Sequence, residues 1–296
     1  MMRKDLVSVV ITTCRREYKL LKEAIESVRS QTYRDIELIV VDDNGAGSPI
    51  QQDVEAALKP HQDIIYLVNA TNSGAQVSRN RGILASHGEF VAFLDDDDIW
   101  APDKIEKQMR LMQNESLDLV FCNGYRFYNN DLNDTKLYQV NFIGDRELDF
   151  ATELRQDHIG STSIPLMRKE CLAQTGLFDV NMPARQDFDM WIRFCKYFRV
   201  KGINEPLFYY RYHSGERITS SYKKELRSYR LLLRKYAEDF AKDKVAKSNM
   251  LFTLCITCAK SRHAPSAIAY GVRAFICSPK SVIRTISNHR HKIAQF

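Results

Sequence analysis

The chain has no apolar run long enough to cross a lipid bilayer. The first apolar stretch, Leu6 to Ile11, and the longest later one, Met250 to Ala259, are far shorter than a membrane-spanning helix of roughly 20 residues. The first is also too short for the apolar region of a secretory signal peptide. With 44% apolar and 27% charged residues, the composition predicts a globular protein, which we expect in the cytoplasm.

A regular cysteine pattern is also missing. The seven cysteines are an odd number without repeated spacing, which argues against a disulfide framework and favours a reducing compartment. Cys255 and Cys258 are spaced like half of a metal site, but no second pair of cysteines or histidines accompanies them. We interpret them as two small apolar residues on one helix face.

No acidic residue follows Asp243. The same segment contains nine basic residues: Lys244, Lys247, Lys260, Arg262, Arg273, Lys280, Arg284, Arg290 and Lys292. Because the whole chain carries +6, the residues before this segment carry −3. This asymmetry predicts a surface that meets phosphate groups, and we expect peripheral contact with the inner face of the plasma membrane. Nucleic acid is not an expected partner, because no aromatic platforms are interleaved with the basic residues.

Short β-branched apolar runs alternate with segments of helical periodicity in the first 122 residues. Strands are predicted at Val7–Ile11, Ile36–Val41, Ile64–Val68, Phe90–Leu94 and Leu117–Cys122. Helices are predicted from Leu20 to Val28, from Gln76 to Ser86 and from Pro102 to Met112. This alternation is typical of an α/β fold, with a mainly parallel sheet flanked by helices.

The alternation ends near residue 122, which suggests three parts. Residues 1–122 contain the alternating strands and helices. Residues 123–220 are rich in Tyr and Phe and predict mixed sheet with long loops, which would shape a second substrate site. Residues 221–296 are predicted to be a helical, basic extension, with helices from Tyr222 to about Ala259 and from Ser266 to Ile276.

Four consecutive aspartates, Asp95 to Asp98, follow the strand at Phe90–Leu94. Adjacent carboxylates repel one another, so a metal ion is the expected partner, and oxygen ligands favour magnesium, manganese or calcium over zinc. Polar clusters at Thr12 to Arg16 and at Asp42-Asp43 follow two other strands. Ligands bind at the carboxyl ends of parallel strands, so we expect the three clusters to line one crevice that suits a metal and a diphosphate.

Three groups of motifs, in this order and spacing, resemble family 2 glycosyltransferases, which have the GT-A fold. The first comprises Ser8 to Thr13, Ser27 to Tyr33 and Glu37 to Asp43; the second, Asn72 to Gly74, Ser78 to Ile83, Ala85 to Phe90 and Leu94 to Trp100; the third, Gly176 to Asp179 and Gln186 to Arg193. They span about residues 6 to 213. The resemblance implies that residues 1–122 bind a nucleotide-sugar and that 123–220 bind the acceptor, and it leaves 221–296 without a diagnostic motif.

The resemblance also implies roles for single residues in the nucleotide site. Asp43 would accept a hydrogen bond from the uracil of a UDP-sugar, with Thr12 and Arg15 lining the base pocket. Gly74 and Arg79 would help to hold the nucleotide. The family often has Tyr-Asn where Cys14-Arg15 stand here, so the stacking of the base would differ in detail.

Further implied roles concern the metal and the reaction. Asp95, Asp96 and Asp97 match the DXD motif: Asp97 would bind Mn²⁺ or Mg²⁺, and the other two would contact metal, ribose or donor sugar. Asp187 matches the catalytic base. His213 occupies a position where the family often has His, and would complete the metal site or contact the diphosphate; a packed or solvated imidazole is the alternative.

The activity implied is inverting, metal-dependent transfer of a sugar from a nucleotide-sugar to a hydroxyl of a saccharide or lipid-linked saccharide, as in bacterial polysaccharide assembly. Two other interpretations remain. Gln186 stands where the family usually has Glu, which would fit a sugar-nucleotide-binding protein with a decayed site. A sugar nucleotidyltransferase would need a glycine-rich phosphate loop after the first strand, and Thr12 to Glu17 contains no glycine.

Overall fold

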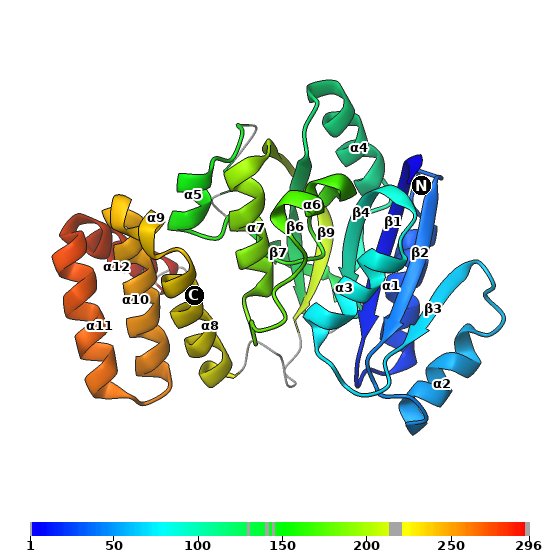
Figure 1. Cartoon of the computed structure of the whole chain (residues 1–296), viewed down its shortest axis with the longest axis horizontal. Coiled ribbons are helices and arrows are strands. Elements are labelled where there is room, and N and C mark those ends of the chain that lie inside the picture. Colours follow the sequence, from blue (N-terminus) through cyan, green and yellow to red (C-terminus); the bar gives the residue numbers. More distant parts are fainter. Residues whose placement is uncertain (1, 129–130, 140–141, 144–145, 213–220, 294–296) are drawn as a thin grey trace.

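The computed structural model describes all residues except 1, 129–130, 140–141, 144–145, 213–220 and 294–296 (Figure 1). Its strands are β1 (Arg3–Thr13), β2 (Ile36–Asp42), β3 (Ile64–Val68), β4 (Gly88–Asp95), β5 (Ile99–Trp100), β6 (Leu119–Tyr128), β7 (Asp131–Leu137), β8 (Leu166–Arg168) and β9 (Val200–Tyr212). Its α-helices are α1 (Tyr18–Arg29), α2 (Pro49–Leu58), α3 (Ala75–Ala85), α4 (Lys104–Glu115), α5 (Phe150–Arg155), α6 (Leu172–Thr175), α7 (Gln186–Tyr197), α8 (Tyr222–Lys235), α9 (Ala237–Lys242), α10 (Lys244–Lys260), α11 (Ala264–Cys277) and α12 (Pro279–Ile293).

One mixed sheet forms the centre of the larger part of the molecule (Figure 1). Its order is β3-β2-β1-β4-β8-β6-β9-β5, with β7 paired to β6. The strands β1, β2, β3 and β4 are parallel, whereas β8 runs antiparallel to its neighbours β4 and β6. The predicted mainly parallel α/β sheet is therefore present, and each antiparallel pair includes a strand that begins after residue 118, where the alternation of strands and helices ends.

The parallel strands are almost fully apolar because helices cover both of their faces. In β1, Val7, Val9, Val10 and Ile11 each have a relative exposure of 0%. Helix α3 approaches this strand closely at Gly82, where a Cβ added to the glycine would lie 2.3 Å from Val10 Cγ1. The glycine thus sets the distance between α3 and β1, and with it the position of residues at the start of α3.

The predicted strands all form, but several helix boundaries differ. The helix predicted to start at Pro102 begins at Lys104, after Asp103, whose φ of −103° is not helical. Helix α2 was not predicted. Its start does have a common signal in the sequence, because Ser48 accepts a hydrogen bond from Gln51 N at 3.3 Å and Pro49 occupies the first turn. The segment predicted to be helical over 222–259 is divided at Tyr236 and Asp243 into α8, α9 and α10.

A second apolar core joins the C-terminal helices to the rest of the molecule. It is formed by residues before and after position 220: Leu154, Met182, Phe188 and Ile192, together with Tyr229, Leu232, Tyr236, Phe240, Ala246, Met250 and Leu254. Figure 1 shows α8 beside α7, with α10, α11 and α12 further from the sheet. No helix among the described residues has both the length and the apolarity needed to cross a membrane.

Candidate functional site

The carboxyl ends of three parallel strands meet at one edge of the sheet. Strand β1 lies between β2 and β4, and its register places Thr13 opposite Asp42 and Thr12 opposite Asp95. The ends of β1, β2 and β4 and the loops that follow them contain six of the ten predicted site residues: Thr12, Arg15, Asp43, Asp95, Asp96 and Asp97. The predicted convergence of the three polar clusters therefore follows directly from strand order and register.

Asp43 organises the loop that leads into α3. Its Oδ1 accepts hydrogen bonds from Asn69 Nδ2 at 2.7 Å and from the Ser73 backbone N at 2.8 Å, and its Oδ2 accepts from the Gly74 N at 2.8 Å. Gly74 has a φ of +93°, a conformation that favours glycine, and it caps the start of α3. The 3% exposed carboxylate of Asp43 thus holds Gly74 in place; contact with uracil remains a prediction.

The loop after β1 places two neighbouring arginines differently. Arg15 is exposed with a φ of +55°, and its backbone N donates to Asn44 Oδ1 at 2.6 Å. Arg16 instead points to the acidic motif, where its Nη2 donates to Asp97 Oδ2 at 2.7 Å. Thr12 is partly buried at the end of β1. Arg16 belongs to the polar cluster predicted to line the crevice, but no individual role was predicted for it, and its contact with Asp97 is seen only in the structure.

Arg79 and Asp95 form a partly buried ion pair. The Nη2 of Arg79 donates to Asp95 Oδ1 at 2.7 Å, and Thr162 Oγ1 donates to the same oxygen at 3.2 Å. Arg79 is 5% exposed, and its buried Nη1 has no hydrogen-bond partner within the described residues. The pair joins the start of α3 to the end of β4, which are 16 residues apart in the chain.

Asp96 and Asp97 share Arg16 as a cationic neighbour. Arg16 Nε lies 3.6 Å from Asp96 Oδ1, and Thr13 Oγ1 donates to Asp96 Oδ2 at 2.7 Å. Burial, followed by the charge of Asp97, raises the pKa of Asp96 to about 7. Burial and the neighbouring aspartates therefore outweigh the hydrogen bond from Thr13 and the charge of Arg16, both of which favour the ionised form of Asp96.

The fourth aspartate of the run, Asp98, is buried and stabilises the loop through hydrogen bonds. Asp98 is 1% exposed; its Oδ2 accepts from Ser163 Oγ at 2.7 Å and its Oδ1 from the Arg211 backbone N at 3.2 Å. Burial raises its pKa well above the ordinary value, and the charge of Asp97 adds to the effect. We therefore assign Asp98 to the architecture of the loop rather than to ligand contact.

Asp187 lies in the first turn of α7, shortly after the strained Arg185, whose φ is +57°. Its Oδ1 accepts a hydrogen bond from the Phe188 backbone N at 2.8 Å. Burial raises the pKa of Asp187, while Arg185 and Arg79 lower it and Asp95 raises it. The candidate base is thus within electrostatic reach of the Arg79–Asp95 pair at the strand ends.

Two further carboxyl groups, Glu153 and Asp157, lie near Asp187. Asp157 Oδ1 accepts from the Gly160 N at 2.8 Å, and burial, followed by the charge of Asp187, raises the pKa of Asp157 to about 6. Glu153 is fully buried, and burial together with Asp157 raises its pKa well above the ordinary value. Sequence reasoning missed both residues, because residues 123–175 contain none of the motifs on which the site prediction rests.

The side chain of Asp189, two residues after Asp187, is buried among hydrogen-bond partners from neighbouring helices. It is 0% exposed and accepts hydrogen bonds from Arg193 Nη2 at 2.9 Å, from Lys235 Nζ at 2.9 Å and from the Tyr236 hydroxyl at 2.9 Å. These partners come from α7, α8 and the junction with α9. The remaining predicted residue, His213, lies outside the described residues.

The acidic motif suits a hard cation only together with ligands from a substrate. Within the described residues, no group of three or more His, Cys, Asp or Glu side chains is arranged to hold a metal. Magnesium in nucleotide sites commonly takes one or two protein carboxylates, with phosphate oxygens and water as further ligands. Asp95 and Asp97 offer such oxygens, so they fit a site completed by a diphosphate, and the metal remains a prediction.

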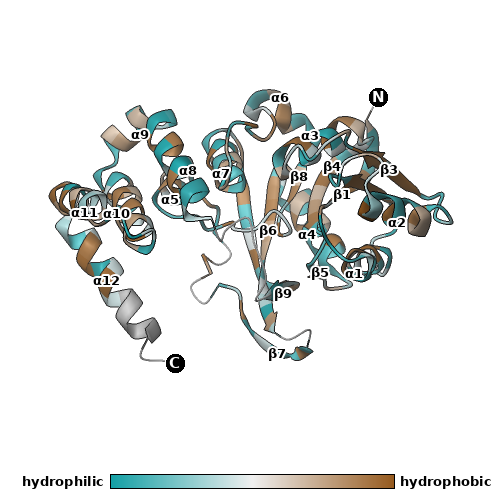
Figure 2. Cartoon of the chain, turned by 90° about the horizontal axis from the view of Figure 1, so that it is seen from below, coloured by the Kyte–Doolittle hydropathy of each residue, from teal (hydrophilic) through white to brown (hydrophobic). Residues whose placement is uncertain are grey.

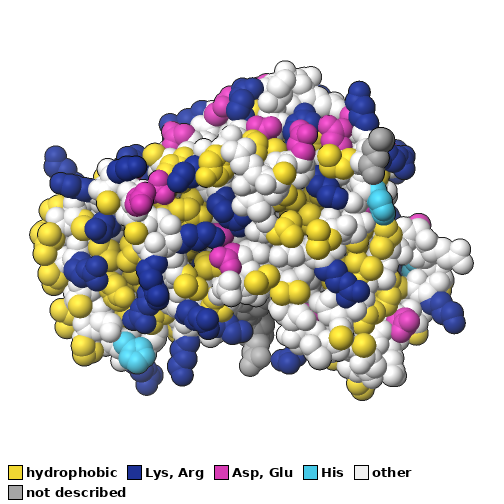
Figure 3. Space-filling model, viewed as in Figure 1, with side chains coloured by type: hydrophobic (Ala, Val, Ile, Leu, Met, Phe, Trp, Pro, Cys, Tyr) yellow, Lys and Arg dark blue, Asp and Glu magenta, His cyan; other side chains and the backbone are white. Residues whose placement is uncertain are grey.

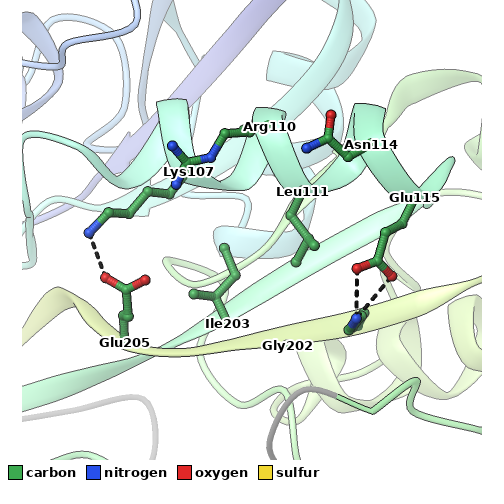
Figure 4. Close-up of a pocket in the computed structure, with 9 residues that line it drawn as sticks. Lys107, Arg110, Leu111, Asn114, Glu115, Gly202, Ile203 and Glu205 are labelled. Atoms are coloured by element: carbon green, nitrogen blue, oxygen red, sulfur yellow. Dashed lines mark hydrogen bonds and ion pairs between the residues drawn. The ribbon is translucent and has the colours of Figure 1, made fainter.

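Two surface pockets lie away from the strand ends. The first, of about 300 Å³, lies between α4 and β9 (Figure 4), where Lys107 pairs with Glu205 and Lys201 with Glu115 at 2.5 and 2.7 Å. The second, of about 510 Å³, lies along α2 and β3. Neither is lined by a predicted site residue, and the lysines of the first are already neutralised, so we assign no role to either.

Comparisons with known proteins bear on the fold and the family. The chain resembles S. aureus TarS 1-349 in complex with UDP-GlcNAc, with a TM-score of 0.61 and 15% identity over 90% of each chain, a likeness of fold alone. It is 31% identical to an uncharacterised glycosyltransferase of Methanocaldococcus jannaschii, over 76% of this chain and 77% of that protein.

Two further relatives have more specific names. A putative teichuronic acid biosynthesis glycosyltransferase of Bacillus subtilis, TuaG, is 34% identical over 70% of this chain and 79% of its own. An Escherichia coli UDP-Glc:alpha-D-GlcNAc-diphosphoundecaprenol beta-1,3-glucosyltransferase, WfaP, is 27% identical over 77% of this chain and 86% of its own. The family model for glycosyl transferase family 2 matches residues 8–176, more than half of the chain. With its GT-A fold, the chain therefore belongs to glycosyl transferase family 2, as the sequence motifs predicted.

Proposed function

We propose that the chain transfers a sugar, with inversion, from a UDP-sugar to a hydroxyl of a lipid-linked saccharide. The name of WfaP supports this donor and this class of acceptor, the UDP-GlcNAc bound by TarS supports the donor, and the name of TuaG supports polysaccharide assembly. The single observation that carries the proposal is the placement of Asp187 within electrostatic reach of Arg79 and Asp95. This supports a role in proton transfer for a carboxylate near the residues that are predicted to meet the diphosphate.

The residues divide between two chemical tasks. Asp187, with its raised pKa, would accept the proton of the acceptor hydroxyl as that oxygen attacks the anomeric carbon. Asp95 and Asp97 would hold Mg²⁺ or Mn²⁺, which would neutralise charge on the departing diphosphate. Inversion requires the base and the diphosphate on opposite sides of the sugar, which matches a base on α7 and acidic residues at the end of β4.

Arg16 and Arg79 would position the donor's charged groups. Both guanidinium groups already pair with carboxylates of the acidic motif, Arg16 with Asp97 and Arg79 with Asp95, each at 2.7 Å. These pairs orient the aspartates and reduce their mutual repulsion before a ligand arrives. Asp43 fixes the orientation of Gly74 through a hydrogen bond, so the backbone at the start of α3 would already be in place when the nucleotide binds.

Calorimetric titration with UDP tests the donor site. We expect wild-type protein to bind UDP with manganese and to lose most of its affinity with a chelator, and Asp97→Ala to bind weakly under both conditions. Asp103→Ala is the matched control, because Asp103 follows the motif but pairs with Lys107 at 2.7 Å. Metal-independent binding, or full affinity in Asp97→Ala, would contradict the assigned metal role, and GDP or dTDP binding in place of UDP would contradict the donor.

A further inference from the structure

Helix α11 buries its small side chains and exposes its large apolar ones. Ala267 and Ala274 are 8% and 0% exposed, and the Cβ position of Gly271 lies 3.3 Å from Cys255 Sγ of α10. The opposite face presents Ile268, Val272, Phe275 and Ile276, with exposures of 68, 54, 49 and 74%. Surface helices of globular proteins normally turn such residues inward, and none of the described residues covers this face of α11.

The same arrangement continues into α12. Val282 is 7% exposed and packs with Leu251 and Ala274, whereas Ile283 and Ile286 are 57 and 42% exposed. The space-filling view shows apolar side chains gathered at the end of the molecule formed by α11, with lysines and arginines among them (Figure 3). We call the exposed apolar residues of both helices the terminal apolar face: Ile268, Val272, Phe275, Ile276, Ile283 and Ile286.

Basic side chains accompany this face. Arg273, Lys280 and Arg284 are exposed on the same two helices, and residues 244–296 contain no acidic side chain. A second copy of the chain is a poor occupant, because symmetric contact would bring two such basic segments together. A surface that is both apolar and anionic fits better, and a bilayer with anionic headgroups has both properties.

The terminal apolar face lies far from the parallel strands of the sheet. Helices α11 and α12 lie at the end of the molecule remote from β1, β2 and β3 (Figure 1), and the turned view shows α12 extending away from the neighbouring helices (Figure 2). A flat surface could therefore meet α11 and α12 without contacting the sheet.

We propose that the terminal apolar face docks on the surface of an anionic bilayer, with α11 and α12 lying among the headgroups rather than crossing the membrane. The apolar side chains would enter the boundary between headgroups and acyl chains, and the basic residues would contact lipid phosphates. The inference does not depend on the proposed reaction, because it concerns residues outside the candidate site.

Co-sedimentation with vesicles, without donor or acceptor, tests the proposal. We expect the full chain to bind phosphatidylcholine vesicles containing phosphatidylglycerol much more strongly than phosphatidylcholine vesicles. Ile268→Ser/Ile276→Ser should weaken binding by at least about tenfold, because two exposed isoleucines no longer enter the bilayer. The matched control, Ile50→Ser/Leu84→Ser, removes two exposed apolar residues elsewhere, 41 and 75% exposed, and should bind like wild type.

A charge variant tests the electrostatic part. Arg273→Glu/Lys280→Glu/Arg284→Glu should lose binding to anionic vesicles, whereas Lys4→Glu/Lys22→Glu/Lys59→Glu, with the same change in net charge, should retain most of it. Absence of vesicle binding by wild type, or equal binding by all variants, would overturn the proposal. So would a wild-type dimer in light scattering that becomes monomeric in Ile268→Ser/Ile276→Ser, since the face would then bind a second copy.

Discussion

Two carboxylates on α7 show how strongly the surroundings of a residue decide its role. Asp187 is partly buried, has one hydrogen bond from the Phe188 N, and its pKa is influenced by the charges of Arg79 and Asp95. Asp189 is fully buried and satisfied by cations from two helices. The first remains the candidate base, and the second joins α7 to α8.

This difference predicts opposite outcomes for two similar substitutions. Asp187→Asn should lower kcat by about 10²–10⁴-fold while UDP affinity and thermal stability change little, because only proton transfer is lost. Asp189→Asn should lower the free energy of unfolding by about 3–5 kcal/mol, because Arg193 and Lys235 keep their charges without a buried counter-charge. Steady-state kinetics and chemical denaturation measure both effects. Full turnover by Asp187→Asn would refute the base assignment.

At the scale of elements, the contact between α3 and β1 determines where the nucleotide residues lie. Gly82 permits this contact, since a side chain there would meet Val10. Gly74 and Arg79 belong to the start of α3, so a shift of this helix would move both relative to Asp43 and Asp95. Close packing in the core therefore controls the geometry of the candidate site.

Gly82→Ala should reduce stability by about 1–3 kcal/mol, because the added methyl group overpacks the α3–β1 contact. Val10→Ala removes the two methyl carbons that lie closest to the new Cβ, so the double variant should be more stable than the sum of the two single effects predicts. Denaturant titration of the four proteins measures the coupling. Strict additivity would show that the contact does not limit the approach of α3.

At the scale of the whole molecule, the C-terminal helices are connected to the candidate base. Arg185 precedes Asp187 by two residues, and its guanidinium pairs with Glu225 and lies over the Tyr229 ring, both on α8. The second apolar core includes α5, α7, α8 and α10. The proposed boundary near residue 220 remains a prediction, but the helices after it take part in positioning a residue that tunes the pKa of Asp187.

The connection predicts a change in the pH dependence of kcat. A base must be ionised to act, so activity rises as pH passes the pKa of Asp187, and Arg185 lowers that pKa. Arg185→Gln should therefore move the acidic limb of the kcat–pH profile to higher pH. Glu225→Gln is the control: it removes the partner but keeps the Arg185 charge, so the limb should stay or move to lower pH. An unchanged limb in Arg185→Gln would contradict the assignment.

The sequence by itself determined the five strands predicted in the first 122 residues, their alternation with helices, the sheet edge where polar residues gather, and the family. These features depend on local periodicity and on motif spacing, which a single chain displays directly. The sequence did not predict α2, because the start signal at Ser48-Pro49 is short and local. It also did not predict α12, because that helix contains few apolar residues.

Only the tertiary structure decided how four identical aspartates differ. Asp95 pairs with Arg79, Asp96 and Asp97 share Arg16, and Asp98 is buried against Ser163. The partners lie between 16 and 81 residues away in the chain. Pairings of this kind depend on strand register and helix packing rather than on spacing. For the same reason, the environments of Glu153, Asp157 and Arg185 could be recognised only from the packing of α5, α7 and α8.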